Sequence, residues 1–238
     1  MKPSTKNSIA QTFLHLDYEA LGKIYCDEGG EAFWQHRQGP CQRLGKKIAS
    51  HLNQSLAPKG RSLYIGAGVA ELPMLIVETA DLDRSVFPYS LRKKEVAILN
   101  KACTALPFQF LADNALHAQG KFDHLWLVSV LNDPECYPQT SALSYGRATP
   151  FDFDPDAYKK EQYILLRLIH SCLRKLSIPG LVTTSVEEVP WITTWCLEHN
   201  IPFHLESKTF PTAIVGDPLC FIHLDETPPP KASNQKEL

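Results

Sequence analysis

The chain has 238 residues, of which 44% are hydrophobic, and a formal net charge of −2. This length fits one large domain or a core domain with a cap, and the charge gives no electrostatic reason to expect binding to nucleic acid or to an anionic membrane. Seven scattered cysteines without a CxxC pair disfavour a disulfide framework and a zinc site, so no metal is expected. No apolar signal segment or membrane-length run occurs, so the cytoplasm is the expected compartment.

The N-terminal part of the chain is predicted to be helical. Residues 1–10 are polar and are expected to form a loose tail, whereas 11–56 carry apolar residues at helical spacing. The clearest run recurs every four residues, at Leu44, Ile48, Leu52 and Leu56. Pro58-Lys-Gly60 then marks a junction, so 1–57 is interpreted as a helical N-terminal cap.

Strands and helices alternate along the next part of the chain. The predicted strands are 61–65, 85–89, 108–112, 122–131 and 180–186, and the predicted helices are 69–80, 91–104, one starting near Asp154-Pro155, and 190–199. Two closing strands, near 202–210 and 218–225, follow without a helix between them and are expected to be antiparallel. Residues 134–153 show no periodicity, and 228–238 are expected to form a flexible tail.

The most informative segment is the strand that runs directly into Gly66-Ala-Gly68. Glycine permits a tight turn and lets a ligand approach the backbone without a Cβ in the way. The helix that follows directs its free N–H groups toward the same place, as in the first βα turn of a doubly wound sheet. The segment therefore favours a nucleotide-like ligand, the alternative being a tight strand-to-helix turn without one.

Three segments, in this order and spacing, carry a family resemblance: Leu63-Tyr-Ile-Gly-Ala-Gly-Val-Ala, Phe110-Leu-Ala-Asp-Asn-Ala-Leu-His and Lys121-Phe-Asp-His-Leu-Trp-Leu-Val-Ser-Val-Leu-Asn-Asp. Over about residues 58–226 the chain resembles the seven-stranded S-adenosylmethionine-dependent methyltransferases. The resemblance implies a Rossmann-like α/β domain at 58–227, doubly wound around a mainly parallel seven-stranded sheet with an antiparallel last strand. It also implies S-adenosylmethionine as cofactor.

The resemblance also suggests site residues. The cofactor-binding candidates are Gly66, Gly68, Glu71, Tyr89, Asp113 and Asn114, and the candidate catalytic base is Asp133. Three of them have simpler interpretations that stay open. Glu71 suits the first turn of a helix, Asp113 suits a helix cap, and Asp133 suits a solvated Asn-Asp-Pro turn.

Two departures from the family pattern concern the cofactor. Tyr64 stands where many members have an acid, and Val86-Phe-Pro-Tyr-Ser lacks the acid that usually holds the ribose hydroxyls after the second strand. A lost charge-assisted contact costs about 1.5–3 kcal/mol unless Tyr89 or Ser90 replaces part of it. The expected function is methyl transfer to a small molecule, with no nucleic-acid or membrane partner. The alternatives are a degenerate binding or interaction module and, less favoured because the third glycine is Ala70, a nicotinamide-dinucleotide enzyme.

Overall fold

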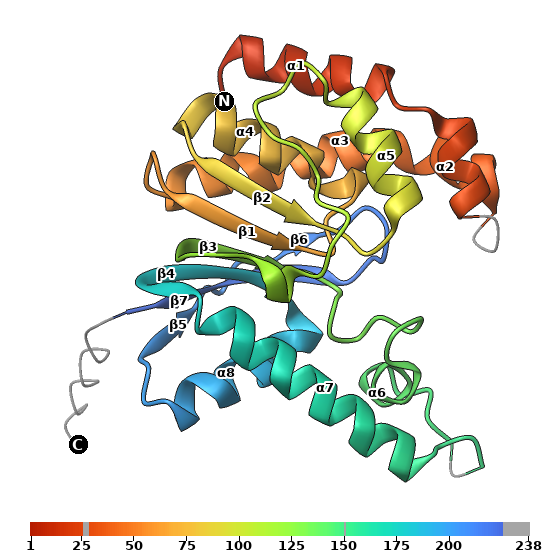
Figure 1. Cartoon of the computed structure of the whole chain (residues 1–238), viewed down its shortest axis with the longest axis vertical. Helices are drawn as coiled ribbons and strands as arrows, with labels where there is room; N and C mark the ends of the chain where they lie inside the picture. Colours follow the sequence, from red (N-terminus) through yellow and green to blue (C-terminus); the bar gives the residue numbers. More distant parts are fainter. Residues whose placement is uncertain (26–28, 150, 226–238) are drawn as a thin grey trace, which may run out of the picture.

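The computed structural model describes residues 1–25, 29–149 and 151–225, in which one mixed sheet is covered by helices on both faces (Figure 1). The sheet has seven strands in the order β2-β1-β3-β4-β7-β5, with β6 pairing to β7. The bounds are β1 Arg61–Ile65, β2 Ser85–Tyr89, β3 Phe122–Leu127, β4 Leu176–Ser185, β5 Phe203–Leu205, β6 Phe210–Pro211 and β7 Pro218–Leu224.

The strand directions follow the predicted pattern. Strands β2, β1, β3 and β4 are parallel, and β7 runs antiparallel to β4, β5 and β6. The predicted α/β class with a mainly parallel seven-stranded sheet and an antiparallel last strand is therefore confirmed. The apolar runs at Leu63–Ile65 in β1 and Leu125–Leu127 in β3 are explained by their position, since both are central strands covered on both faces.

The predicted strand at 108–112 is wrong. Only Leu111 pairs there, through an isolated parallel bridge to Tyr89. Two local features prevent residues 108–112 from pairing with β2 as a full strand. The side chain of Asn100 accepts from the N–H of Phe110 and donates to its carbonyl, and Pro88 in β2 has no N–H to donate. The count of seven strands is reached because the first closing segment is split into β5 and β6.

Eight α-helices are present in the described residues: α1 Pro3–Leu14, α2 Tyr18–Ile24, α3 Gly30–Ser55, α4 Leu72–Leu82, α5 Lys93–Ala102, α6 Pro138–Ser144, α7 Pro155–Leu173 and α8 Val189–Glu198. One hydrophobic cluster packs α1–α5 against one face of the sheet, and a second packs α7 and α8 against the other. Asp154 caps α7 as predicted, since its side chain accepts from the N–H groups of Asp156 and Ala157. No helix in these ranges is both long enough and apolar enough to cross a bilayer.

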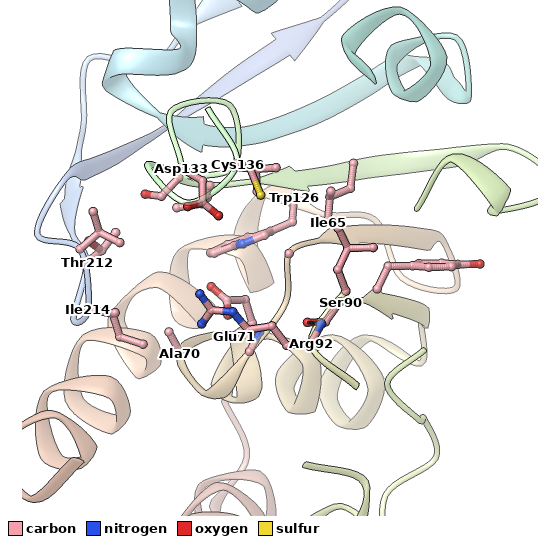
Figure 2. A pocket seen from close by; sticks show the side chains of 18 of the residues that line it. Ile65, Ala70, Glu71, Ser90, Arg92, Trp126, Asp133, Cys136, Thr212 and Ile214 are labelled. Carbon is pink, nitrogen blue, oxygen red and sulfur yellow. Dashed lines mark hydrogen bonds between the residues drawn. The ribbon is translucent and has the colours of Figure 1, made fainter. Parts of the chain in front are cut away.

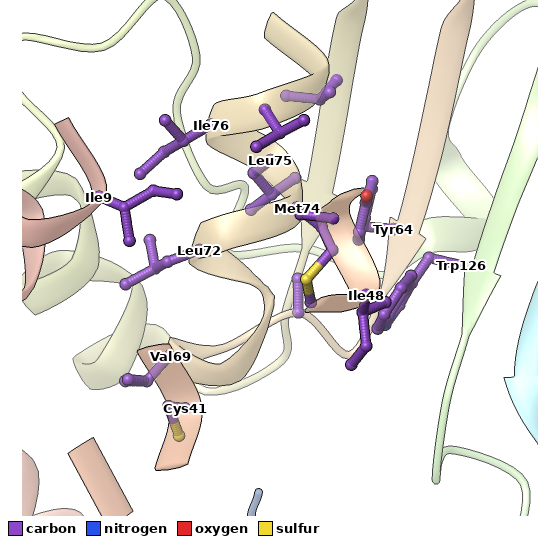
Figure 3. Close-up of a cluster of buried hydrophobic side chains, with 14 of the residues drawn as sticks. Ile9, Cys41, Ile48, Tyr64, Val69, Leu72, Met74, Leu75, Ile76 and Trp126 are labelled. Carbon is purple, nitrogen blue, oxygen red and sulfur yellow. The ribbon is translucent and has the colours of Figure 1, made fainter. Parts of the chain in front are cut away.

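The beginning of the chain is not a loose tail. Helix α1 starts at Pro3, and its Ile9 is fully buried against α4 in a cluster that also holds Ile48 of α3 and Tyr64 of β1 (Figure 3). Sequence reasoning missed this helix because only a few of its positions are apolar. Residues 134–153 also contain a short helix, α6, which Glu161 of α7 holds by accepting from the N–H and hydroxyl of Thr140. The tail predicted at 228–238 lies outside the described residues.

A buried polar network explains what Tyr64 does in place of an acid. The Tyr64 hydroxyl donates to Glu78 of α4, and the same carboxylate contacts Nε of Arg84 at 3.1 Å and Nδ1 of His124 at 3.1 Å. Burial by itself would raise the pKa of Glu78, but the neighbouring His124 and Arg84 lower it below its usual value. Arg84 also contacts Asp123. Tyr64 therefore joins β1 to α4 inside the core.

Candidate functional site

A cavity of about 720 Å³ opens at the carboxyl ends of β1, β2 and β3, where ligands bind in doubly wound sheets (Figure 2). All seven residues singled out from the sequence line it: Gly66, Gly68, Glu71, Tyr89, Asp113, Asn114 and Asp133. In Figure 2, Asp133 and Cys136 lie on the upper side, Glu71 and Ala70 on the lower side, and the Trp126 ring between them. The topology therefore brings segments almost seventy residues apart to one hollow.

Two N–H groups of the glycine turn donate hydrogen bonds to other groups of the protein. Gly66 has a φ of +70°, in the left-handed region that favours glycine. The Ala67 N–H donates to the Tyr89 carbonyl at 3.0 Å, and the Gly68 N–H donates to Oε2 of Glu71 at 2.8 Å. The α-helix starts at Leu72, because a 3₁₀ turn at Val69–Glu71 lies between it and the loop. Two backbone donors of the loop are thus already used inside the protein.

Glu71 combines both interpretations made from the sequence. Its carboxylate accepts from the Gly68 N–H while its own N–H donates to the Gly68 carbonyl at 3.3 Å, and its side chain also faces the cavity. Burial raises the pKa of Glu71 to about 7, although hydrogen bonds from the Gly68 N–H and the Trp126 side chain act in the opposite direction. The charge of this carboxylate is consequently sensitive to a cation placed beside it.

Beyond the end of β2, the cavity is lined by Tyr89 and Ser90, which carry hydroxyls and no charge. An acid does lie nearby, on the following helix. Glu95 of α5 is 2% exposed, accepts from the Tyr25 hydroxyl at 3.0 Å, and lies with Oε1 3.0 Å from where a Cβ on Gly68 would stand. Sequence reasoning missed Glu95 because an acid in a helix's first turn is common and gives no sign of which way it points.

Asp113 and Asn114 follow Leu111, which bridges Tyr89 at the end of β2, and are held by local hydrogen bonds. The side chain that caps the short turn at Ala115–His117 belongs to Asn114, which accepts from the Leu116 N–H at 3.0 Å. Asp113 accepts from the Asn114 N–H at 2.7 Å and contacts Nδ1 of His117 at 2.9 Å, and these contacts lower its pKa. The Asp113 carboxylate remains half exposed, so it can still accept a further hydrogen bond.

The turn after β3 is held in place by a buried acid that sequence reasoning missed. Glu188, fully buried at the start of α8, accepts from the N–H groups of Ser129, Val130 and Leu131 at 3.2, 2.6 and 2.6 Å. Burial raises the pKa of Glu188 to about 7 despite these hydrogen bonds. The arrangement sets the path of the chain into Asp133, whose Oδ1 accepts from the Glu135 N–H at 2.9 Å. Asp133 therefore shapes its turn and also lines the cavity.

The loop between β6 and β7 forms another wall of the cavity. Thr212 and Ile214 line the cavity there, and Nη1 of Arg37 in α3 donates to the Ala213 carbonyl at 3.0 Å. Tyr145 joins this loop to the turn after β3, because its hydroxyl accepts from Nδ2 of Asn132 at 2.7 Å and donates to Asp217. The structure thus adds a whole wall that no sequence motif marked.

The fold matches solved structures, although no family model and no curated protein sequence matches the chain. The magnesium protoporphyrin IX methyltransferase ChlM of Synechocystis, solved with bound S-adenosylmethionine, superposes with a TM-score of 0.50 at 10% identity, over 87% of this chain and 97% of that one. The chain has the methyltransferase fold. Two other matches are TrmN from Thermus thermophilus (TM-score 0.46, 14% identity, 75% of this chain and 48% of that one) and a precorrin-6y C5,15-methyltransferase from Geobacter metallireducens (0.46, 10%, 76% and 87%).

Within this methyltransferase fold, the chain spans about half the length of TrmN and most of ChlM. At these identities the likeness describes the arrangement of the strands and helices and does not reach individual side chains.

Proposed function

We propose that the chain is an S-adenosylmethionine-dependent methyltransferase that acts on a small-molecule acceptor. The observation that carries the proposal is the single cavity that joins the glycine turn, the Asp113–Asn114 segment and the Asp133 turn. A methyltransferase needs this combination, because a donor and an acceptor must be held close together and in line.

The charges of the cavity support S-adenosylmethionine over a nicotinamide dinucleotide. A pyrophosphate needs free N–H donors at the glycine turn, but those of Ala67 and Gly68 are bonded to Tyr89 and Glu71. The Glu71 carboxylate would also repel it. A cationic sulfonium ligand without phosphate meets neither obstacle.

The residues have separate roles in this proposal. Gly66 and Gly68 form the wall on which the cofactor lies, Tyr89 and Ser90 offer hydroxyls beside it, and Asp113 accepts from an amino group at its outer edge. The bound cofactor supplies an activated methyl group for in-line displacement. Asp133 takes the proton of an O–H or N–H acceptor, while the turn held by Glu188 keeps that carboxylate in position.

The second candidate is a binding or interaction module without catalysis, and the absence of an acid at the end of β2 favours it. Isothermal titration calorimetry with S-adenosylmethionine, its demethylated product S-adenosylhomocysteine and nicotinamide adenine dinucleotide separates the candidates. We expect the first two to bind saturably and the dinucleotide not to bind. Dinucleotide binding alone would contradict the proposal, and no binding of S-adenosylmethionine at millimolar concentration would favour the module.

A further inference from the structure

The charged side chains around the cavity are mostly acidic. Among the described residues that line it, five carry carboxylates, whereas Arg92 and Arg167 are the basic ones, and Arg92 is paired with Glu135 at 2.9 Å. The carboxylates belong to Glu71, Glu95, Asp113, Asp133 and Glu135. Such a cavity attracts cations and repels phosphate groups.

The centre of the cavity is suited to a positive charge. Trp126 stands between Asp133 on one side and Glu71 on the other (Figure 2). Trp126 itself is 2% exposed and stacks on Tyr64, so an ammonium group here would be attracted by the two carboxylates beside the buried ring. A cation here would also keep Glu71 ionised, since burial holds its pKa near 7.

The end of the cavity away from Ser90 is apolar. Ala70 and Ile214 lie there in Figure 2, and Leu44 of α3 and Val215 line the same cavity. Two rim residues expose large apolar side chains, with Ile164 of α7 at 52% and Val215 at 54% of their possible surface. This end can therefore bury an apolar group.

We propose that the acceptor is an amine with an apolar body, its nitrogen between Asp133 and Trp126 and its body toward Ile214 and Val215. This inference rests on the proposed function and narrows its substrate class. The ammonium first gives one proton to the Asp133 carboxylate. The free nitrogen lone pair then forms the N–C bond as the S–C bond breaks, its electron pair goes to sulfur, and the products are a methylated ammonium and a thioether.

The test compares two probes with the same body and opposite charge, 2-phenylethylamine and 3-phenylpropionate. Each is titrated by calorimetry at about pH 8 into the full chain saturated with S-adenosylhomocysteine. We expect the amine to bind at least about tenfold more tightly, the effect of one charge-assisted hydrogen bond. Asp133→Asn should remove most of that preference, while Asp152→Asn, which changes an exposed acid outside the cavity, should keep it.

The outcomes separate the two proposals. Failure of S-adenosylhomocysteine to bind would contradict the methyltransferase function itself. If it binds, the amine inference is overturned by equal or tighter binding of 3-phenylpropionate, by no binding of the amine at millimolar concentration, or by displacement of the amine by bulk transfer RNA. Val215→Ser, at the rim, should weaken both probes by a similar factor, because it changes the apolar contact and leaves the charges unchanged.

Discussion

Two glycine-to-alanine substitutions, two residues apart, should affect different properties: Gly66→Ala the thermal stability and Gly68→Ala the binding of the cofactor. Gly66 has a φ of +70°, and a Cβ there would lie 3.0 Å from Cγ2 of Val130. Alanine in the left-handed region costs about 1–2 kcal/mol, so Gly66→Ala should lower Tm by about 2–8 °C in a chain of this size. Gly68 has a φ of −142°, which any residue adopts, so the backbone tolerates alanine there.

The cost of Gly68→Ala should instead appear in cofactor binding. Its Cβ would lie 3.0 Å from Oε1 of Glu95 and 3.8 Å from Oε2 of Glu71, in the wall of the cavity. Overpacking costs about 1–3 kcal/mol, and the part of it that the bound cofactor meets at this wall should raise Kd by up to about 150-fold. Calorimetry with S-adenosylhomocysteine measures the Kd, and thermal unfolding measured by circular dichroism gives Tm for the same samples.

The control is Gly39→Ala, on an exposed part of α3 where a Cβ would meet nothing within 4 Å. It should leave the Kd for S-adenosylhomocysteine unchanged. A folded Gly68→Ala variant that binds the ligand within about twofold of the unsubstituted protein would refute the reasoning, because it would show that this face of the loop does not touch the cofactor. A Gly66→Ala variant with unchanged Tm would refute the strain argument.

Three other predictions concern charged groups. Arg84→Met removes the guanidinium from the buried carboxylate of Glu78 and leaves it only the contact with His124, so it should lower the free energy of unfolding in urea by about 3–5 kcal/mol. The exposed pair should lose little in Lys23→Met. Burial raises the pKa of Glu71 from 4.5 to about 7, so between these pH values the folded state binds more protons than the unfolded state. The free energy of unfolding of the wild type should therefore fall relative to that of Glu71→Gln as the pH rises from about 4.5 to 7. Parallel plots of the free energy of unfolding against pH for the two proteins would contradict this. Asp133→Asn should lower turnover of a proton-bearing acceptor by about 10²–10⁴-fold with cofactor affinity nearly unchanged, and full turnover in single-turnover assays would leave Asp133 with only its role in the turn.

The sequence alone was sufficient to predict the elements that depend on local residue patterns. The bounds of β1 and β2 were predicted to the residue, because short apolar runs between turn-forming residues leave little choice. The candidate residues from Gly66 to Asp133 reach one cavity because each follows a strand or strand-like segment on the same edge of the sheet. Their roles in binding and catalysis stay predictions.

Tertiary structure decided what depends on partners distant in the sequence. Asn100 and Pro88 prevent residues 108–112 from pairing with β2, and Tyr64 is held in the core by its hydrogen bond to Glu78. The acids that flank or support the site, Glu95 and Glu188, sit on helices whose spacing alone gives no direction toward a ligand. A hydrogen bond or ion pair between segments depends on how those segments pack, and one chain's composition and periodicity do not record that packing.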